Sequence, residues 1–260
     1  MELPIYQVDA FASRLFAGNP AAVCPLQEWL PGPTMQAIAN ENNLAETAFF
    51  VPSSGDWELR WFTPAAEVSL CGHATLATAF VIATFLAPGR NLMRFHSRSG
   101  VLEVARQGEI YSLDLPARPP APTEAPLEMA SSLGAAPESV MRAAEDYVAV
   151  FDSEATVKGL QPDLGRLAKL PAEGTIVTAP GRDVDFVTRY FAPAIGIPED
   201  PVTGAAHCAL VPYWSQRLGK SNLHARQISA RGGELFCRAL GQRVMLSGRA
   251  VLYLEGRIHV

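Results

Sequence analysis

Two glycine-containing turns, one in each half of the chain, combine acid–base side chains with the start of an apolar helical run. They contain Cys71, Gly72 and His73 in the first half, and Asp200, Thr203, Gly204, Ala205 and His207 in the second. The first N–H groups of a helix have no partner inside the helix, and the helix dipole places partial positive charge there. Each turn is therefore predicted to hold a small anion such as a carboxylate.

Glu46 opens the apolar strand-like run TAFFV, an unusual place for a carboxylate. Partial burial there would make it a stronger base and suit it to general acid–base work. Plainer interpretations stay open at this point. Glu46 could be a surface charge, Asp200 a helix cap in an Asp-Pro turn, and Cys71 a small buried apolar residue. His207 lies deeper in its helical run, where core packing is the simpler account.

Other catalytic signatures lack their residues. The chain contains no GxGxxG after a strand, no GxxxxGK[ST], no GxSxG and no HExxH. No three metal ligands cluster in the sequence, so no metal site is expected. Lys and Arg number 21 against 26 for Asp and Glu, which gives a net charge of −5. No cationic face for nucleic acid is predicted from that balance.

The elements that would position these residues form an internal repeat. Phe62-Thr63-Pro64 matches Phe191-Ala192-Pro193 at an offset of 129 residues, and Arg98-Ser-Gly-Val-Leu matches Arg231-Gly-Gly-Glu-Leu at 133. Each half also contains one apolar helical run. The pattern predicts an α+β fold of two pseudo-symmetric modules, each a mixed sheet or barrel wrapped around a central helix. Two such modules would face each other across a cleft, with both turns pointing into it.

Apolar alternation and β-branched runs place the expected elements along the chain. A surface helix is expected over 33–42 and a helix buried on every side over 74–87. Strands are expected near residues 5–8, 21–23, 48–51, 58–62, 101–104, 110–113, 147–151, 176–178, 184–191, 235–238 and 244–246. The modules span 1–116 and 127–260, joined by the proline-rich linker 117–126, and the last strand is a candidate to return to the first module.

Composition limits the class of protein. The 260 residues are 48% hydrophobic and 18% charged, which predicts a compact globule. The amino terminus has no signal-peptide pattern, and the longest apolar run is too short to span a membrane. Four cysteines without a CxxC pair indicate reduced thiols and a cytoplasmic location. Apolar strands in a chain with so little charge favour a homodimer.

Several motifs taken in order resemble the phenazine-biosynthesis PhzF-like family. They are Phe16-Ala-Gly-Asn19-Pro-Ala-Ala-Val, Leu44-Ala-Glu46-Thr, Phe62-Thr-Pro, Cys71-Gly72-His73-Ala-Thr, Glu199-Asp200-Pro-Val-Thr203-Gly204-Ala-Ala-His207 and Gln227-Ile-Ser-Ala-Arg-Gly-Gly. The resemblance covers nearly the whole chain. It implies a fold like that of diaminopimelate epimerase, with two modules that each enclose a helix.

The resemblance also implies a reaction. The family's isomerase shifts a proton within its substrate without a cofactor, and its acid–base glutamate corresponds to Glu46. Its aspartate and histidine correspond to Asp200 and His73, and a substrate-contacting asparagine to Asn19. One departure concerns the substrate: the family isomerase has a serine where this chain has Ala205.

The leading hypothesis is a cofactor-independent isomerase acting on a small carboxylate-bearing molecule. Glu46 would move the proton, His73 and Asp200 would orient it, and the two helix turns would hold the acid. A two-base racemase or epimerase using Cys71 and Asp200 is the first alternative. A ligand-binding or interaction protein without catalysis is the second.

Overall fold

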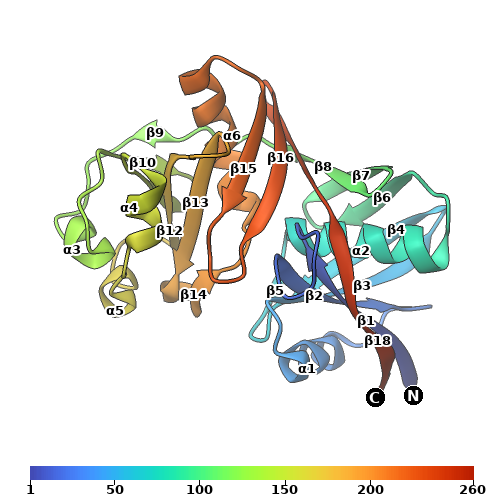
Figure 1. Ribbon diagram of the computed structural model, residues 1–260. Coiled ribbons are helices and arrows are strands. Elements are labelled where there is room, and N and C mark those ends of the chain that lie inside the picture. Colours follow the sequence, from blue (N-terminus) through green and yellow to red (C-terminus); the bar gives the residue numbers. More distant parts are fainter. The chain divides into compact units, whose positions relative to one another are not determined.

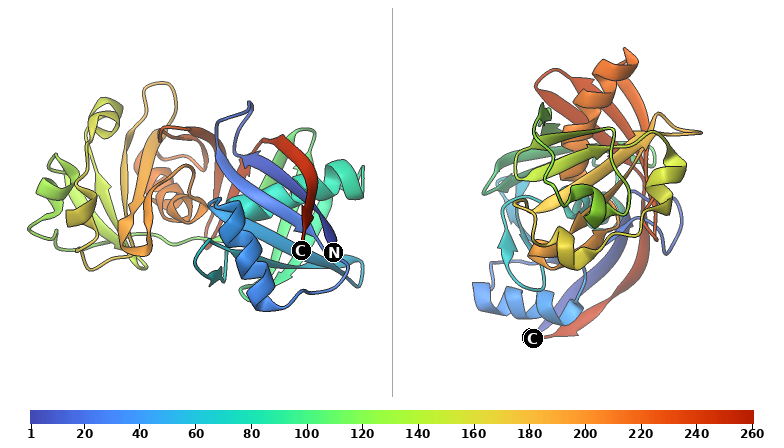
Figure 2. Two further views of the ribbon diagram at one scale, coloured as in Figure 1. Left: turned by 90° about the horizontal axis from the view of Figure 1, so that it is seen from below. Right: turned by 90° about the vertical axis from the view of Figure 1, so that its left-hand side faces the viewer.

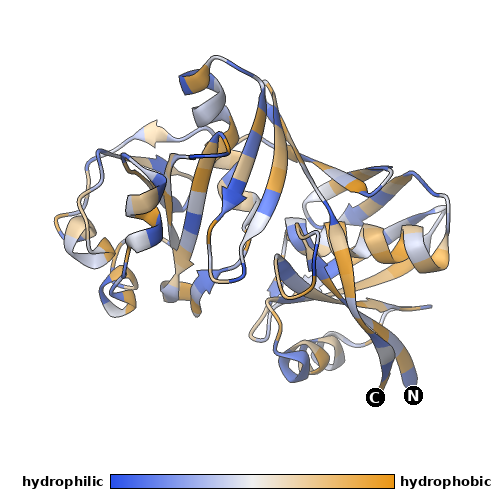
Figure 3. Ribbon diagram, viewed as in Figure 1, coloured by the Kyte–Doolittle hydropathy of each residue, from blue (hydrophilic) through white to orange (hydrophobic).

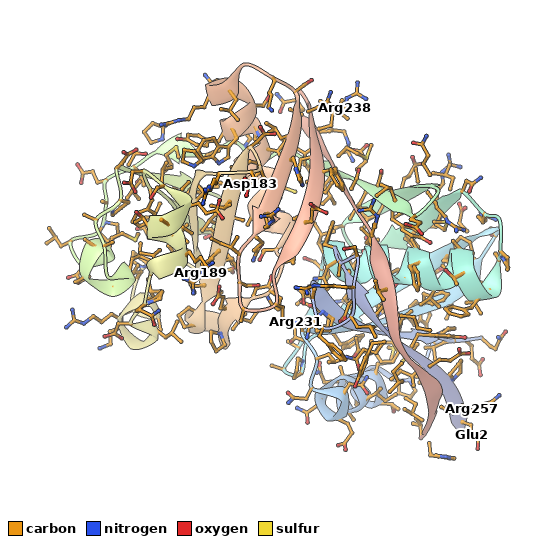
Figure 4. All side chains as sticks on the ribbon, in the orientation of Figure 1. Glu2, Asp183, Arg189, Arg231, Arg238 and Arg257 are labelled. Carbon is orange, nitrogen blue, oxygen red and sulfur yellow. The ribbon has the colours of Figure 1, made fainter.

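The computed structural model describes residues 1–260 and divides into two compact units. Unit 1 comprises Met1–Asp114 and Ser247–Val260, and unit 2 comprises Leu115–Leu246. Unit 1 is discontinuous because β18 (Ala250–His259) pairs antiparallel with β1 (Glu2–Ala10). In Figure 1 the red end of the chain runs beside the blue end, and in Figure 4 Arg257 lies beside Glu2, 3.2 Å away in an ion pair.

The sheet of unit 1 starts at the edge strand β18 and continues through β1, β2, β3, β4, β6, β7 and β8. The β2–β3 and β4–β6 pairs are parallel and the others antiparallel. The remaining bounds are β2 (Asn19–Pro25), β3 (Glu46–Ser53), β4 (Asp56–Phe62), β6 (Leu92–Ser97), β7 (Gly100–Gln107) and β8 (Ile110–Pro116). A short β5 (Glu67–Val68) pairs with β4.

The sheet of unit 2 has the strand order β9, β10, β11, β12, β13, β15, β16. Its parallel pairs are β11–β12 and β13–β15. The bounds are β9 (Ala121–Pro122), β10 (Ser139–Ala143), β11 (Asp146–Val150), β12 (Gly174–Pro180), β13 (Phe186–Ala192), β15 (Asn222–Gln227), β16 (Gly233–Leu240) and β17 (Arg243–Gly248). A short β14 (Ile197–Asp200) pairs with β13.

The two units repeat one topology, as the sequence repeat predicts. From β1 to β7 and from β10 to β16, strands pair in the same order and with the same parallel and antiparallel senses. The helix between the fifth and sixth strands is α2 (Gly72–Val81) in unit 1 and α6 (Gly204–Leu218) in unit 2. Strands separated by a crossover pair in parallel and consecutive hairpin strands pair antiparallel.

Each sheet is covered on two faces. In unit 1, α1 (Gly32–Asn42) packs on β3 and β4 through Met35, Ile38 and Ala39, and α2 contacts β1, β2 and β3. Strand β3 is consequently apolar without alternation, because both of its faces are buried. In unit 2, three short helices cover the equivalent face: α3 (Met129–Leu133), α4 (Glu154–Gly159) and α5 (Leu164–Leu167). Figure 2 shows α1 on the outside of its unit, and Figure 3 shows how apolar α2 is.

The end of the central helix differs from the expectation of complete burial. Burial of the run extends to Ala83, broken only by a half-buried Phe80, but Thr84 and Leu86 are exposed. The segment Ile82–Leu86 is a π-helical turn, and the Ala87 N–H donates to the Ile82 carbonyl at 2.7 Å. The run therefore reaches solvent at its carboxyl end, because the wider turn ends the helix beside Pro88 and Gly89.

The proline-rich stretch 117–126 lies within unit 2. Ala121 and Pro122 form β9 and pair with Arg142 and Met141 of β10. Its prolines therefore do not prevent strand pairing, because an edge strand tolerates a missing N–H. None of the helices is both long enough and apolar enough to cross a membrane.

Candidate functional site

The site residues of unit 1 come together because two parallel strands begin beside the start of α2. Asn19 is the first residue of β2 and Glu46 the first of β3, and the pairing places Ala21 opposite Glu46. Cys71 is the N-cap residue of α2, and His73 lies in its first turn. Four of the residues singled out from the sequence thus contribute side chains to one cluster, which we call the Glu46 cluster: Asn19, Glu46, Cys71 and His73.

His73 lies at the centre of the Glu46 cluster. Its Nε2 is 3.0 Å from Glu46 Oε2, and its Nδ1 is 3.5 Å from Cys71 Sγ and 3.3 Å from Asn19 Nδ2. The His73 and Glu46 side chains keep only 6% and 14% of their surface exposed. The Nε2 and Oε2 atoms are buried without an aligned hydrogen bond, so their contact is an ion pair with unused hydrogen-bonding capacity.

Burial and mutual charge set the protonation of the cluster. Burial raises the pKa of the Cys71 thiol, and the Glu46 carboxylate raises it further, so the thiol holds its proton. Burial lowers the pKa of His73, but the Glu46 carboxylate, 3.0 Å from Nε2, raises it by more, to well above its ordinary value. At neutral pH the cluster therefore contains an imidazolium beside the Glu46 carboxylate.

The same three groups have the spacing of a metal site, since a donor atom of each lies within 4.8 Å of the others. Their orientation favours proton transfer instead. The imidazole ring presents Nε2 to Glu46 and Nδ1 to Cys71. A metal ion bound to one ring nitrogen would lie on the opposite side of the ring from the residue that faces the other nitrogen.

Backbone N–H groups at the start of α2 lie beside the Glu46 cluster and are available as hydrogen-bond donors. Cys71 has extended backbone angles, and no side chain caps the helix. Gly72, which carries no side chain, opens the helix directly after it. Unpaired N–H groups and the helix dipole make this end attractive to a carboxylate.

The site residues of unit 2 form a turn held by Gln227, which is fully buried at the end of β15. Gln227 Oε1 accepts from the Thr203 N–H at 2.8 Å, and Nε2 donates to the Asp200 carbonyl at 2.7 Å. Thr203 Oγ1 donates to Asp200 Oδ2 at 2.5 Å. Gly204 follows as the first residue of α6, and Ala205 is exposed between buried neighbours.

The structure corrects which residues are equivalent in the two turns. The offset of 129 residues between the Phe62 and Phe191 motifs, continued to the turns, would align Cys71 with Asp200. The N-cap of α6 is Thr203, however, so Cys71 corresponds to Thr203. The next turn supports this alignment. Thr75 Oγ1 donates to the Cys71 carbonyl at 2.5 Å, and His207 Nδ1 lies 2.8 Å from the Thr203 carbonyl. Asp200 lies three residues before the N-cap residue Thr203 and ends β14. The stretch between the Phe-Ala-Pro motif and α6 is longer than its counterpart in unit 1, so the offset of 129 residues does not hold at the helix turns.

His207 is a packing residue, as its place in the helix suggested. It is fully buried against Phe186, and burial lowers the pKa of its imidazole to about 4. The neutral ring donates from Nδ1 to the Thr203 carbonyl, and Nε2 has no partner. The ring thus fixes the first turn of α6 without carrying charge.

We expect His207 to make the protein sensitive to acid. Its folded pKa of about 4 lies below the ordinary 6.5, so its contribution to stability is present above pH 6.5 and is lost as pH falls towards 4. The gap corresponds to a loss of ~3 kcal/mol. Urea unfolding of His207→Asn at pH 7 and pH 4.5 should show a weaker pH dependence than the unmodified protein. The exposed His96→Asn serves as control, and equal pH dependence in all three proteins would contradict this account.

Comparison with known proteins identifies the family. The model of the phenazine biosynthesis-like protein family matches residues 8–256. The chain belongs to this family. An uncharacterized isomerase of Pseudomonas aeruginosa is 52% identical over 260 residues, covering 100% of both chains. Membership and this relative place the chain among the isomerases, and they confirm the resemblance carried by the sequence motifs.

Solved structures confirm the fold. The crystal structure of a PhzF family phenazine biosynthesis protein from Enterococcus faecalis matches with a TM-score of 0.97 at 45% identity, covering 100% of both chains. A hydroxyproline epimerase from Agrobacterium vitis matches with a TM-score of 0.62 at 10% identity, covering 99% of this chain and 92% of the other. The family fold and the epimerase fold are thus one architecture of two repeated units.

Sequence reasoning missed the residues that hold the two turns. Gln227 drew attention only as part of a motif, and Thr75 as part of another. Both are polar and fully buried. Thr75 stands in an apolar helical run, and that mismatch is a signal in the sequence, since a buried polar side chain requires a partner. Gln227 gives no such signal, because most residues of β15 are polar. The partner itself becomes visible only when β15 and the α6 turn are placed together.

Proposed function

We propose that the protein is a cofactor-independent isomerase that moves a proton on a small carboxylate-bearing substrate, with Glu46 as the general acid–base. The observation that carries the proposal is the pair of buried atoms, Glu46 Oε2 and His73 Nε2, that face each other without an aligned hydrogen bond. Buried polar groups are nearly always satisfied, and exceptions gather at functional sites.

The chemistry follows from the charges of the Glu46 cluster. The substrate carboxylate binds at the uncapped start of α2, where N–H groups and the neighbouring imidazolium both attract it. Glu46 takes a proton from a carbon next to an electron-withdrawing group, and the resulting negative charge is stabilised by the same donors. Glu46 then returns the proton to a different carbon of that molecule. The double bond moves and the overall composition of the substrate is unchanged.

His73 orients the base. The imidazolium holds one carboxylate oxygen of Glu46 through Nε2, and its Nδ1 lies 3.5 Å from Cys71 Sγ. Fixing the carboxylate in this way keeps the remaining exposed part of the side chain directed at solvent and substrate. In unit 2, Asp200 is the second acid–base candidate of the proposal, because its carboxylate is held by the Thr203 hydroxyl.

Proton exchange in heavy water tests the proposal. A panel of small unsaturated and cyclic carboxylic acids is incubated with the protein, and deuterium entry is followed by proton NMR. We expect enzyme-dependent entry at one carbon of at least one acid, together with appearance of its isomer. Saturable binding of an acid with no exchange at any pH would instead support a ligand-binding protein.

Replacement of Cys71 separates the isomerase from the two-base racemase. The buried thiol keeps its proton, so Cys71→Ala should leave exchange within about threefold of the unmodified rate. A racemase that uses this thiol as one of its bases would lose turnover by a factor of ~10³. Cys24→Ala, at another buried thiol in unit 1, is the matched control for the loss of a core sulfur.

A further inference from the structure

Gln227 makes a set of hydrogen bonds that can be assembled in only one way. The Thr203 backbone N–H is a donor, so the atom of Gln227 that faces it must be the amide oxygen. The Asp200 backbone carbonyl is an acceptor, so the atom facing it must be the amide nitrogen. These two backbone groups therefore fix the orientation of the amide, which in other settings can be flipped.

The direction of the next hydrogen bonds follows from that orientation. The same amide nitrogen lies 3.2 Å from Thr203 Oγ1 and donates to it. With one of its two lone pairs engaged by Gln227, the Thr203 hydroxyl directs its own proton to Asp200 Oδ2, 2.5 Å away. A directed chain thus runs from the Gln227 amide through the Thr203 hydroxyl to the Asp200 carboxylate.

A second support comes from the same loop. Ser229 Oγ donates to the Pro201 carbonyl at 2.8 Å and accepts from the Gly232 N–H at 3.1 Å. Gln227 and Ser229 together hold three successive parts of the turn: the Asp200 and Pro201 carbonyls and the Thr203 N–H. The turn before α6 is therefore braced by side chains from β15 and from the loop that follows it.

The repeated topology shows that the fold does not require the contacts of Gln227. Strand registers make Ser97 of β6 the counterpart of Gln227, since the last residue of each strand pairs with the first of the next, Gly100 or Gly233. Ser97 bonds only within its own hairpin, to Gly100 and Ser99. In unit 1, Ser99 Oγ of this hairpin donates to the Ser69 carbonyl at 2.8 Å, as Ser229 does to Pro201 in unit 2. Unit 1 therefore forms the same strand–helix–strand arrangement without a counterpart of the Gln227 contacts.

We propose that Gln227 is a positioning residue that commits the Thr203 hydroxyl to donate to Asp200, and so keeps Asp200 a proton acceptor. The proposal deepens the proposed function and rests on it, because it concerns the charge state of Asp200 in the proposed isomerase. Accepting a hydrogen bond favours the charged form of a carboxylate. A turn with a flexible Thr203 hydroxyl would lose that bias.

Three titratable groups near Asp200, on β13, β14 and α6, are engaged with other partners. Tyr190 lies opposite Asp200 in the β13–β14 register, and its hydroxyl donates to Asp146 at 3.0 Å. Glu199, the neighbour of Asp200 on β14, forms a two-point ion pair with Arg189 at 2.8 and 3.0 Å; Arg189 is labelled in Figure 4. Helix α6 contributes the neutral His207. The loop after β15 contributes Arg231, whose charge is the same in every variant below.

The test is a titration of the Asp200 carboxyl carbon by ¹³C NMR in the substrate-free protein. Asp200→Asn identifies the signal. In Gln227→Met, which removes the amide at nearly constant volume, the Asp200 midpoint should rise by on the order of one pH unit. Thr203→Val should give a similar rise and Thr203→Ser should restore the original midpoint. The exposed Gln242→Met in the same unit is the matched control and should change nothing.

Two results would overturn the proposal. One is an Asp200 midpoint that stays unchanged in Gln227→Met while the protein remains folded. The other is an unchanged midpoint in Thr203→Val, which keeps the backbone contacts of Gln227 and decides the question even if Gln227→Met does not fold. The titration needs no substrate, so its failure leaves the proposed isomerase intact. Conversely, absence of proton exchange with every acid would contradict the proposed isomerase without changing the expected Asp200 midpoints.

Discussion

Glu46→Gln should lower the rate of deuterium entry by ~10²–10⁴, because an amide cannot take up the substrate proton. The substitution keeps the size of the side chain and an acceptor towards His73 Nε2, which lies 3.0 Å from the carboxylate. The amide also removes the negative charge that raises the pKa of His73, so the imidazole loses part of its positive charge. Binding of the carboxylic acid should weaken much less than exchange.

The measurement is the exchange rate in heavy water for an acid that the unmodified protein turns over. The matched control is Glu41→Gln, an exposed carboxylate at the end of α1 in the same unit. Equal exchange by the unmodified protein and Glu46→Gln would remove Glu46 from the mechanism. A similar fall in the exchange rate of Glu46→Gln and Glu41→Gln would point to a general loss of charge or stability instead.

Gly18→Ala should destabilise the folded protein by more than ~3 kcal/mol, through backbone overlap and an unfavourable dihedral angle. Gly18 precedes Asn19 and has a φ of +67°, and an added Cβ would lie 2.1 Å from the Ala10 carbonyl oxygen. The backbone at Ala10 cannot move away without breaking its pairing with Asn19 in the β1–β2 ladder. The change acts at the start of the strand that carries Asn19.

Gly55→Ala separates the two contributions. Gly55 also has a positive φ, +89°, but an added Cβ there has no atom within 4 Å. That variant should lose only ~1–2 kcal/mol, the cost of the left-handed conformation for a residue with a side chain. Urea unfolding of both variants measures the difference. Similar losses at the two positions would mean that the close approach to Ala10 is relieved by local movement.

The architecture was largely predictable because the two halves of the sequence repeat the same pattern of elements. The FTP and FAP motifs fall at the ends of β4 and β13, and the two apolar runs form α2 and α6. Duplication turns weak local signals into a consistent pattern, since a strand expected in one half has a counterpart in the other. Short strands such as β5, β9 and β14 escaped notice, because two to four residues carry too little periodicity to stand out.

The site was predictable to the level of residue types. The sequence pointed to Glu46, His73 and Cys71, and the structure brings these side chains together; it also brings Asp200 to Thr203. The expectation that the two turns meet over one cleft stays a prediction. The alignment of the two helix turns was wrong by three residues. The link from the Phe-Ala-Pro motif to the N-cap of α6 is longer than the link from the Phe-Thr-Pro motif to the N-cap of α2. The direction of a hydrogen bond, as at Gln227, depends on the positions of individual atoms, which residue spacing in the sequence does not give.

The pairing of β18 with β1 has a consequence during synthesis of the chain on the ribosome. Strand β1 is made first, but its antiparallel partner, residues 250–259, is made only after all of unit 2. Throughout that interval one long edge of the nascent first sheet stays open, a template for pairing with a neighbouring chain. Unit 2 is continuous in sequence and can complete its own sheet earlier. A slow stretch of translation before residue 250 would therefore lengthen the exposure of an aggregation-prone edge.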